Sequence, residues 1–89
     1  MNEKEMGKIA DEMKDLIKAK NRTYGDTNII KMGKLGVLTR IEEKVERLRH
    51  MIENNIDDKE SKEDSWKDIA GFGIIGVMLE RERWNNNGR

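Results

Sequence analysis

The stretch Asp68–Glu80, DIAGFGIIGVMLE, decides the fold of this chain. Its glycines have the Gly-x-Gly-x-x-Gly spacing of a dinucleotide-binding loop, which requires a strand before the glycines and a helix after them. The residues before them, EDSWKDIA, are charged and helix-like. The other residues of the stretch are apolar on nearly every side, as in a buried helix. We therefore predict a central helix whose glycines bind no phosphate. At Gly73 and Gly76 a second backbone can approach closely, such as that of a copy in another subunit.

Working outward from this stretch, the periodicity predicts three helices and no sheet. The helix that contains the glycines spans about Lys62–Trp84, with Ser61 as its N-cap and Asp64 at the capping-box position. A second spans about Leu35–Asn54 and a first about Glu3–Lys20, each with apolar residues at three- and four-residue spacing. The segment IIKMGKLG, which precedes the second helix, is predicted to be a short irregular or helical turn. In the second helix the predicted core stripe is Leu38, Ile41, Val45, Leu48 and Ile52.

Composition limits how such a chain can be stable. It has 89 residues, of which 35% are hydrophobic and 40% charged, and it has no Cys. Chains of this size usually need a metal or a partner when disulfides are absent. We therefore predict an all-α, three-helix subunit, residues 1–84, that completes a helical bundle by forming a homo-oligomer, followed by a disordered tail, residues 85–89.

Charge and hydropathy restrict the partners and the location. Eighteen basic residues balance eighteen acidic ones, which argues against a nucleic-acid partner. The longest uncharged run is far shorter than the roughly 20 residues that span a bilayer, so no membrane association is expected. We expect a cytoplasmic protein, in the host cytoplasm if the source is a virus.

The second helix carries a basic row beside its apolar stripe. Arg40, Lys44 and Arg47 lie on one flank, with Glu43 within reach of both arginines. One interpretation is a solvated surface of ion pairs, each worth about 0.2–0.5 kcal/mol. The other is a row that holds phosphate oxygens, which the arginine guanidinium matches in a bidentate manner.

Two carboxylates begin the third helix one turn apart. Asp64 and Asp68 continue into a row of core positions, so they are predicted to lie at the mouth of the core. Such a pair suits Mg²⁺, which binds one or two carboxylates and keeps waters and substrate phosphates as its other ligands. Alternatively, acidic residues in a first turn simply stabilise the positive end of the helix dipole.

Three segments give the chain a family resemblance. KNRTYGD (Lys20–Asp26), RIEEKVERL (Arg40–Leu48) and EDSWKDIAGFGIIGVM (Glu63–Met78) resemble, in order and spacing, the first type of nucleotide-modification-associated domain. That domain is similar to the all-α nucleoside triphosphate pyrophosphatases, which include MazG. The resemblance implies a nucleotide-phosphate site between the second and third helices. The residues that it implies are Lys20, Asn21, Tyr24, Arg40, Glu43, Lys44, Arg47, Asp64 and Asp68.

The resemblance also implies a metal site and a reaction. MazG-type enzymes bind Mg²⁺ through Glu-x-x-Glu on one helix, which Glu43 and Glu46 match, and Glu-x-x-Asp on a later one. Here the second motif is Ser65-x-x-Asp68, with Ser in place of Glu and Asp64 one position away. The expected metal ligands are Glu43, Glu46, Asp64 and Asp68, and the expected catalytic residues are Glu43 and Asp68.

Three functions therefore remain open. The first is a Mg²⁺-dependent nucleoside triphosphate pyrophosphohydrolase. The second is a protein that sequesters a nucleotide or cyclic nucleotide signal without cleaving it, which the Ser65 departure favours and which would suit a viral anti-defence role. The third is a purely structural helical oligomer. Tyr24 either stacks on a base or anchors its loop, while Trp66 and Trp84 are expected at a subunit boundary.

Overall fold

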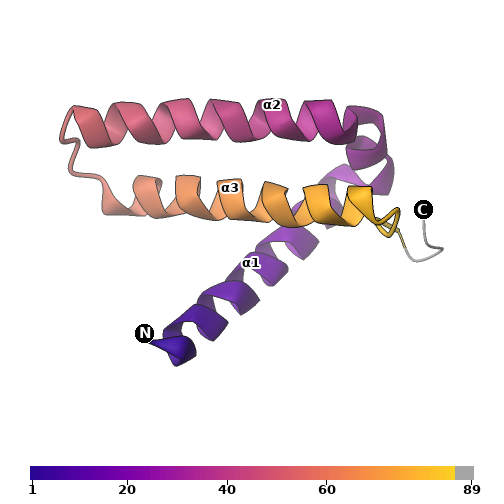
Figure 1. Ribbon diagram of the computed structural model, residues 1–89, viewed down its shortest axis with the longest axis horizontal. Coiled ribbons are helices and arrows are strands. Elements are labelled where there is room, and N and C mark those ends of the chain that lie inside the picture. The colour runs from indigo at the N-terminus through magenta and orange to yellow at the C-terminus, as the bar shows by residue number, and fades with distance from the viewer. Residues whose placement is uncertain (86–89) are drawn as a thin grey trace.

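The computed structural model describes residues 1–85, which form three helices and no strand. Helix α1 spans Glu3–Tyr24, α2 spans Asp26–Glu53 and α3 spans Lys59–Glu80. Figure 1 shows α2 and α3 running antiparallel side by side, with α1 crossing them at a steep angle. The all-α prediction is confirmed. Of the predicted disordered tail, residues 86–89 lie outside the described residues.

The caps place the helix ends differently from the sequence prediction. Asp58, and not Ser61, is the N-cap of α3: its carboxylate accepts hydrogen bonds from the Ser61 backbone N–H (3.0 Å) and hydroxyl (2.8 Å). The helix therefore begins at Lys59, and it ends at Glu80, before Trp84. Helix α1 continues to Tyr24 because the Gly25 backbone N–H donates to the Asn21 carbonyl at 2.7 Å.

Two glycines with positive φ bend the chain between α1 and the long part of α2. Gly25 has φ 82° and separates α1 from α2, and Gly33 has φ 65° inside α2, where it marks a kink. Residues with a side chain rarely adopt this backbone region. The segment IIKMGKLG is therefore helical on both sides of a kink at Gly33. This kink directs the rest of α2 back along α3.

The buried row of α2 matches the predicted stripe at its centre and differs from it at the ends. Leu48 is buried and Ile41 packs against the core, as predicted. Val37 and Met51 are buried in place of Leu38 and Ile52, which are about half exposed, at 51% and 50%. The true row has the spacing 37, 41, 44, 48, 51, which includes a charged position. Lys44 thus faces α3 rather than solvent, and its side chain is only 30% exposed.

Helix α3 is apolar on two opposite faces, but only one face is buried within the chain. Ile75 and Gly71 are buried, and a Cβ added at Gly71 would lie 3.7 Å from the Ile17 side chain. Ile74 and Val77 are exposed, so the prediction that this helix is buried on all sides is wrong within a single chain. No atom lies within 4 Å of a Cβ added at Gly73 or Gly76, so no close approach within the chain explains these glycines.

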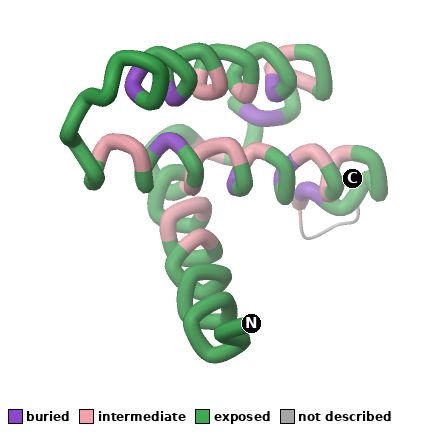
Figure 2. Tube along the Cα trace, turned by 60° about the vertical axis from the view of Figure 1, so that its left-hand side comes forward, coloured by how far each residue is buried: buried purple, intermediate pink, exposed green. Residues whose placement is uncertain are grey.

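The C-terminal segment closes the core over the start of α2. Trp84 is buried, packs in the cluster of Ile29, Val37 and Ile75, and donates its indole N–H to the Asp26 carbonyl at 3.0 Å. The prediction that Trp84 lies at a subunit boundary is therefore wrong, whereas Trp66 is 58% exposed. Figure 2 shows that buried residues gather on α2, α3 and the kinked segment, while the N-terminal part of α1 is exposed throughout.

Within the described residues, no helix combines the length and hydrophobicity needed to cross a membrane. Oligomerisation stays a prediction, motivated by the small core and the exposed apolar residues.

Replacing Trp84 with Phe tests the contact that closes the core. The variant keeps most of the apolar surface but leaves the Asp26 carbonyl without its indole donor. Losing one such hydrogen bond and some volume should lower the free energy of unfolding by about 1–2 kcal/mol in chemical denaturation. Leu35→Ala, at a position 81% exposed, is the matched control and should change stability by less than about 0.5 kcal/mol. Equal stability of wild type and Trp84→Phe would contradict this role.

Candidate functional site

A cavity of about 420 Å³ lies where α1, the first turns of α2 and the middle of α3 meet. Its floor is apolar and includes two aromatic rings, those of Phe72 and Trp84, beside Ile29, Met32 and Ile75. Polar side chains from all three helices also line it. These are Lys20, Asn21, Tyr24, Asn28, Arg40, Lys67 and Asp68. Four of the predicted substrate-binding residues, Lys20, Asn21, Tyr24 and Arg40, are therefore gathered around one cavity, together with the predicted catalytic Asp68.

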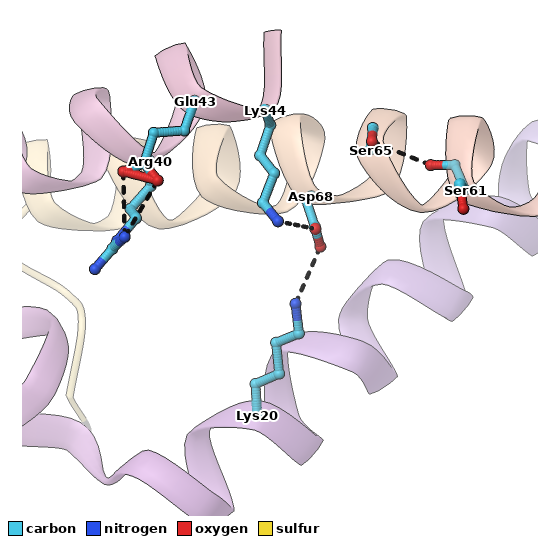
Figure 3. Close-up of polar contacts among 7 residues, drawn as sticks. All are labelled: Lys20, Arg40, Glu43, Lys44, Ser61, Ser65 and Asp68. Carbon is cyan, nitrogen blue, oxygen red and sulfur yellow. Dashed lines mark hydrogen bonds and ion pairs between the residues drawn. The ribbon is translucent and has the colours of Figure 1, made fainter. Parts of the chain in front are cut away.

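Asp68 joins the three helices at the edge of this cavity. One carboxylate oxygen pairs with the Lys20 ammonium of α1 at 3.0 Å, and the other pairs with the Lys44 ammonium of α2 at 3.1 Å. Figure 3 shows the carboxylate between the two lysines, which reach it from opposite sides. The Asp68 side chain is 13% exposed, so it faces the space between the helices as the sequence predicted.

The two lysines decide the ionisation of Asp68. Burial by itself raises the pKa of a carboxyl group, because it disfavours the charged form. Hydrogen bonds and positive charges from Lys20 and Lys44 outweigh that desolvation and hold the pKa of Asp68 below its usual value of 3.8. Asp68 is therefore a carboxylate at neutral pH, and both of its oxygens already have cationic partners.

Arg40 is held far more loosely than the lysines. Its guanidinium pairs with Glu43 one turn along α2 at 3.2 Å, and both side chains are more than half exposed. Pairs of this kind contribute only about 0.2–0.5 kcal/mol, so a ligand can take the guanidinium from Glu43 at little cost. The predicted proximity of Arg40 and Glu43 is confirmed.

Lys67 is a cationic residue of the cavity that the sequence analysis missed. It pairs with Glu12 of α1 at 3.4 Å and is 30% exposed. A signal was present in the sequence, because Lys67 precedes the uncharged residues Gly71 and Ile75 at helical spacing. The structure shows that both of these are buried. Since α1 packs against this face of α3, Lys67 points to the junction of the two helices.

Asn21 and Tyr24 occupy the last turns of α1 beside the cavity. The Asn21 amide donates to the Asp26 carboxylate at 2.6 Å, which fixes the amide nitrogen toward Asp26. Its carbonyl oxygen is enclosed and accepts no hydrogen bond. Tyr24 is 68% exposed, so its ring is open to solvent at the cavity wall. The turn itself is held by the Gly25 backbone N–H and by the Trp84 indole, and the Tyr24 ring stays open to solvent.

The remaining predicted residues lie elsewhere. Arg47, Glu46 and Asp64 are exposed and do not line the cavity. Arg47 lies near the start of α3. Hydrogen bonds from Ser61 lower the pKa of Asp58, and the positive charge of Arg47 lowers it further. Lys44 reaches the site only through Asp68.

The carboxylates predicted to bind Mg²⁺ do not form a donor set in this structure. Within residues 1–85 no group of three or more His, Cys, Asp or Glu side chains is gathered so that it could hold a metal. Glu43 is engaged by Arg40, and both oxygens of Asp68 are engaged by lysines. Ser65, which replaces the Glu of the related motif, is 1% exposed and donates to the Ser61 carbonyl at 3.0 Å. The chain as arranged here does not fit the metal, and Mg²⁺ binding stays a prediction.

Comparisons with protein-family models, with curated proteins and with solved structures found no match to this chain. The family resemblance therefore stays an expectation that rests on the three sequence segments alone.

Asp68→Asn tests the ion-pair bridge through the pH dependence of stability. A carboxyl whose pKa is lowered by folding stabilises the protein above its usual pKa, and this contribution disappears as pH falls through the folded pKa. At neutral pH the variant should be less stable by about 1–2 kcal/mol, and the difference should shrink as the pH falls below 3.8. Denaturation across this pH range provides the measurement.

Asp64→Asn is the matched control, because Asp64 is exposed one turn earlier on the same helix. It should change stability by less than about 0.5 kcal/mol at neutral pH. A difference between wild type and Asp68→Asn that is unchanged at acidic pH would show that the ion pairs do not stabilise the fold.

Proposed function

We propose that the protein binds a nucleotide in the cavity between its three helices and does so without cleaving it. The observation that carries this proposal is the composition of the cavity, in which cationic side chains and aromatic rings line a single hollow of about 420 Å³. Small-molecule sites are typically about 300–1,000 Å³ and largely apolar, with a few convergent polar groups. A nucleotide has both parts, a flat base for the apolar floor and phosphates for the cations.

The charge balance supports an anionic ligand. Lys20, Lys44 and Asp68 together carry two positive charges and one negative charge, so the bridge keeps a net positive charge. Arg40 adds a guanidinium that a phosphate can bind in a bidentate manner, because its contact with Glu43 is exposed and weak. Phosphate oxygens near Lys20 and Arg40 would thus gain two cationic partners without breaking a buried interaction.

The aromatic groups of the cavity support a base as the second part of the ligand. Phe72 belongs to the cavity floor, and Tyr24 lines the cavity with its side chain exposed. Stacking of a base on an aromatic ring contributes about 1–3 kcal/mol and tolerates different bases. The composition of the cavity therefore supports the binding of nucleotides as a class.

The arrangement of carboxylates favours binding over hydrolysis. A Mg²⁺-dependent pyrophosphohydrolase needs carboxylate oxygens that converge on the metal, and here Glu43 and Asp68 are directed to cations while Glu46 and Asp64 lie outside the cavity. A protein that retains a nucleotide intact would act by lowering its free concentration. This form of the proposal needs no metal.

The direct test is calorimetric titration with a panel of nucleoside mono-, di- and triphosphates and cyclic nucleotides. Each titration is run with Mg²⁺ and with a chelator, and the ligand is recovered afterwards and analysed. We expect binding that does not depend on Mg²⁺ and a ligand that is recovered unchanged. Pyrophosphate release that requires Mg²⁺ would replace this proposal with the hydrolase, and no binding by any member would refute both.

Arg40→Ala tests the phosphate end. Charge-assisted hydrogen bonds contribute about 1.5–3 kcal/mol, so affinity for a nucleotide should fall at least tenfold. Arg47→Ala is the matched control, since it removes the same group from an exposed position of the same helix that does not line the cavity. Circular dichroism should show an intact fold in both. If Arg47→Ala weakens binding and Arg40→Ala does not, the phosphate site lies at Arg47, outside the cavity.

A further inference from the structure

Helix α3 exposes an uncharged stripe on the side that faces away from the nucleotide cavity. Trp66, Ala70, Gly73, Ile74 and Val77 recur at helical spacing, and all five are exposed. Trp66, Ile74 and Val77 are 58%, 39% and 49% exposed. The stripe extends over about three helical turns, at 3.6 residues per turn, in a chain of which 40% is charged. Such a surface is unfavourable in water unless something covers it.

Gly73 at the middle of this stripe has no explanation within one chain. A Cβ added there would meet no atom within 4 Å, and Gly73 has no positive φ that would require glycine. Glycine in a helix is less favourable than alanine by about 1 kcal/mol. A missing side chain is useful at this position only if another backbone packs against it, because small residues let helix axes approach closely.

The charged residues beside the stripe indicate which helix packs against Gly73. Glu63 lies at the N-terminal end of the stripe and Arg81 at its C-terminal end, on the same side of the helix. Both are exposed, and neither forms an ion pair within the described residues. Lys62 and Glu80 lie on the opposite rim of the stripe, again one at each end but with the signs reversed. Glu80 also pairs with Lys34 at 3.0 Å. Each rim is therefore charged with opposite signs at its two ends.

This pattern is complementary to itself when two copies of α3 run antiparallel. We propose that the stripe is the interface of a two-fold symmetric dimer of this chain, with the two-fold axis crossing the stripe midway between Ala70 and Gly73. Trp66 then faces the partner's Val77, and Ala70 faces the partner's Gly73. Glu63 faces the partner's Arg81, and Lys62 faces the partner's Glu80. In a symmetric interface every such contact occurs twice.

A groove next to the stripe extends the same surface onto α2. It has a volume of about 230 Å³ and is lined by apolar residues that include Val45, Ile52 and Trp66, together with Arg49 and Glu53. Stable interfaces typically bury about 800 Å² per partner, more than one helix stripe supplies, so this continuation brings the surface toward that size. The nucleotide cavity uses the other side of α3, through Asp68, Gly71 and Ile75, and stays open in the dimer.

Analytical ultracentrifugation of the full chain over a range of micromolar concentrations tests the interface. We expect wild type to sediment as a dimer or as a larger assembly built from such dimers. Ala70→Glu, which buries a charge at the centre of the interface, should weaken association at least tenfold while circular dichroism shows unchanged helix content. Glu42→Arg, on an exposed face of α2 outside the stripe, is the matched control and should associate as wild type does. A monomeric wild type, or full association of Ala70→Glu, would overturn the proposal.

Charge reversal tests the antiparallel register separately. Glu63→Arg and Arg81→Glu should each weaken self-association about threefold or more, because each places two like-charged pairs across the interface. Mixing the two variants should restore association, since each chain then faces the opposite charge, and the double variant should also recover. If the mixture associates no better than the single variants, the antiparallel register is wrong. The result of this experiment does not depend on whether the protein binds a nucleotide.

Discussion

Asp68 connects the fold to the site, because its carboxylate holds one lysine from each of the other two helices. Lys20 approaches from α1 at 3.0 Å and Lys44 from α2 at 3.1 Å. Helix α1 has no buried residue of its own, so its position against α3 depends on this ion pair, on the pair between Glu12 and Lys67, and on the contact of Ile17 with Gly71. The cavity exists because these contacts keep α1 at an angle to the α2–α3 pair.

The same bridge bears on the carboxylates that the sequence suggested as metal ligands. In a Mg²⁺ site the carboxylate oxygens would face the ion, whereas here the ammonium groups of Lys20 and Lys44 contact the two oxygens of Asp68. Under the proposed function, an ammonium group supplies positive charge next to a phosphate without coordination geometry. Electrostatic attraction and hydrogen bonding would then retain the nucleotide. The enclosed Ser65 beside Asp68 is consistent with this arrangement, since its hydroxyl is satisfied by the backbone of its own helix.

The two opposite faces of α3 have different surroundings. One face carries the apolar core and the edge of the cavity, with Asp68, Phe72 and Ile75. The opposite face carries the stripe from Trp66 to Val77, which has no contact partner in the single chain comparable to the core. A helix that is apolar on both sides is unsuited to an isolated small domain but well suited to the centre of an assembly, where each face has a partner. The proposed assembly and the proposed nucleotide binding would therefore use different surfaces of α3.

The sequence by itself determined the helical class and the number of helices, because periodicity and composition are local properties that suffice for these features. The expectation that Lys20, Asn21, Tyr24, Arg40 and Asp68 lie near one site came from the family resemblance, and the structure places all five around one cavity. Tertiary structure decided which way each helix is rotated. The predicted stripe of α2 shares Ile41 and Leu48 with the observed row but was one position off at its ends, and the three-and-four spacing cannot distinguish such neighbouring positions when Val37, Met51, Leu38 and Ile52 are all apolar. That rotation brings Lys44 to Asp68 and leaves Arg47 outside, because ion pairs between helices depend on packing that no single segment encodes.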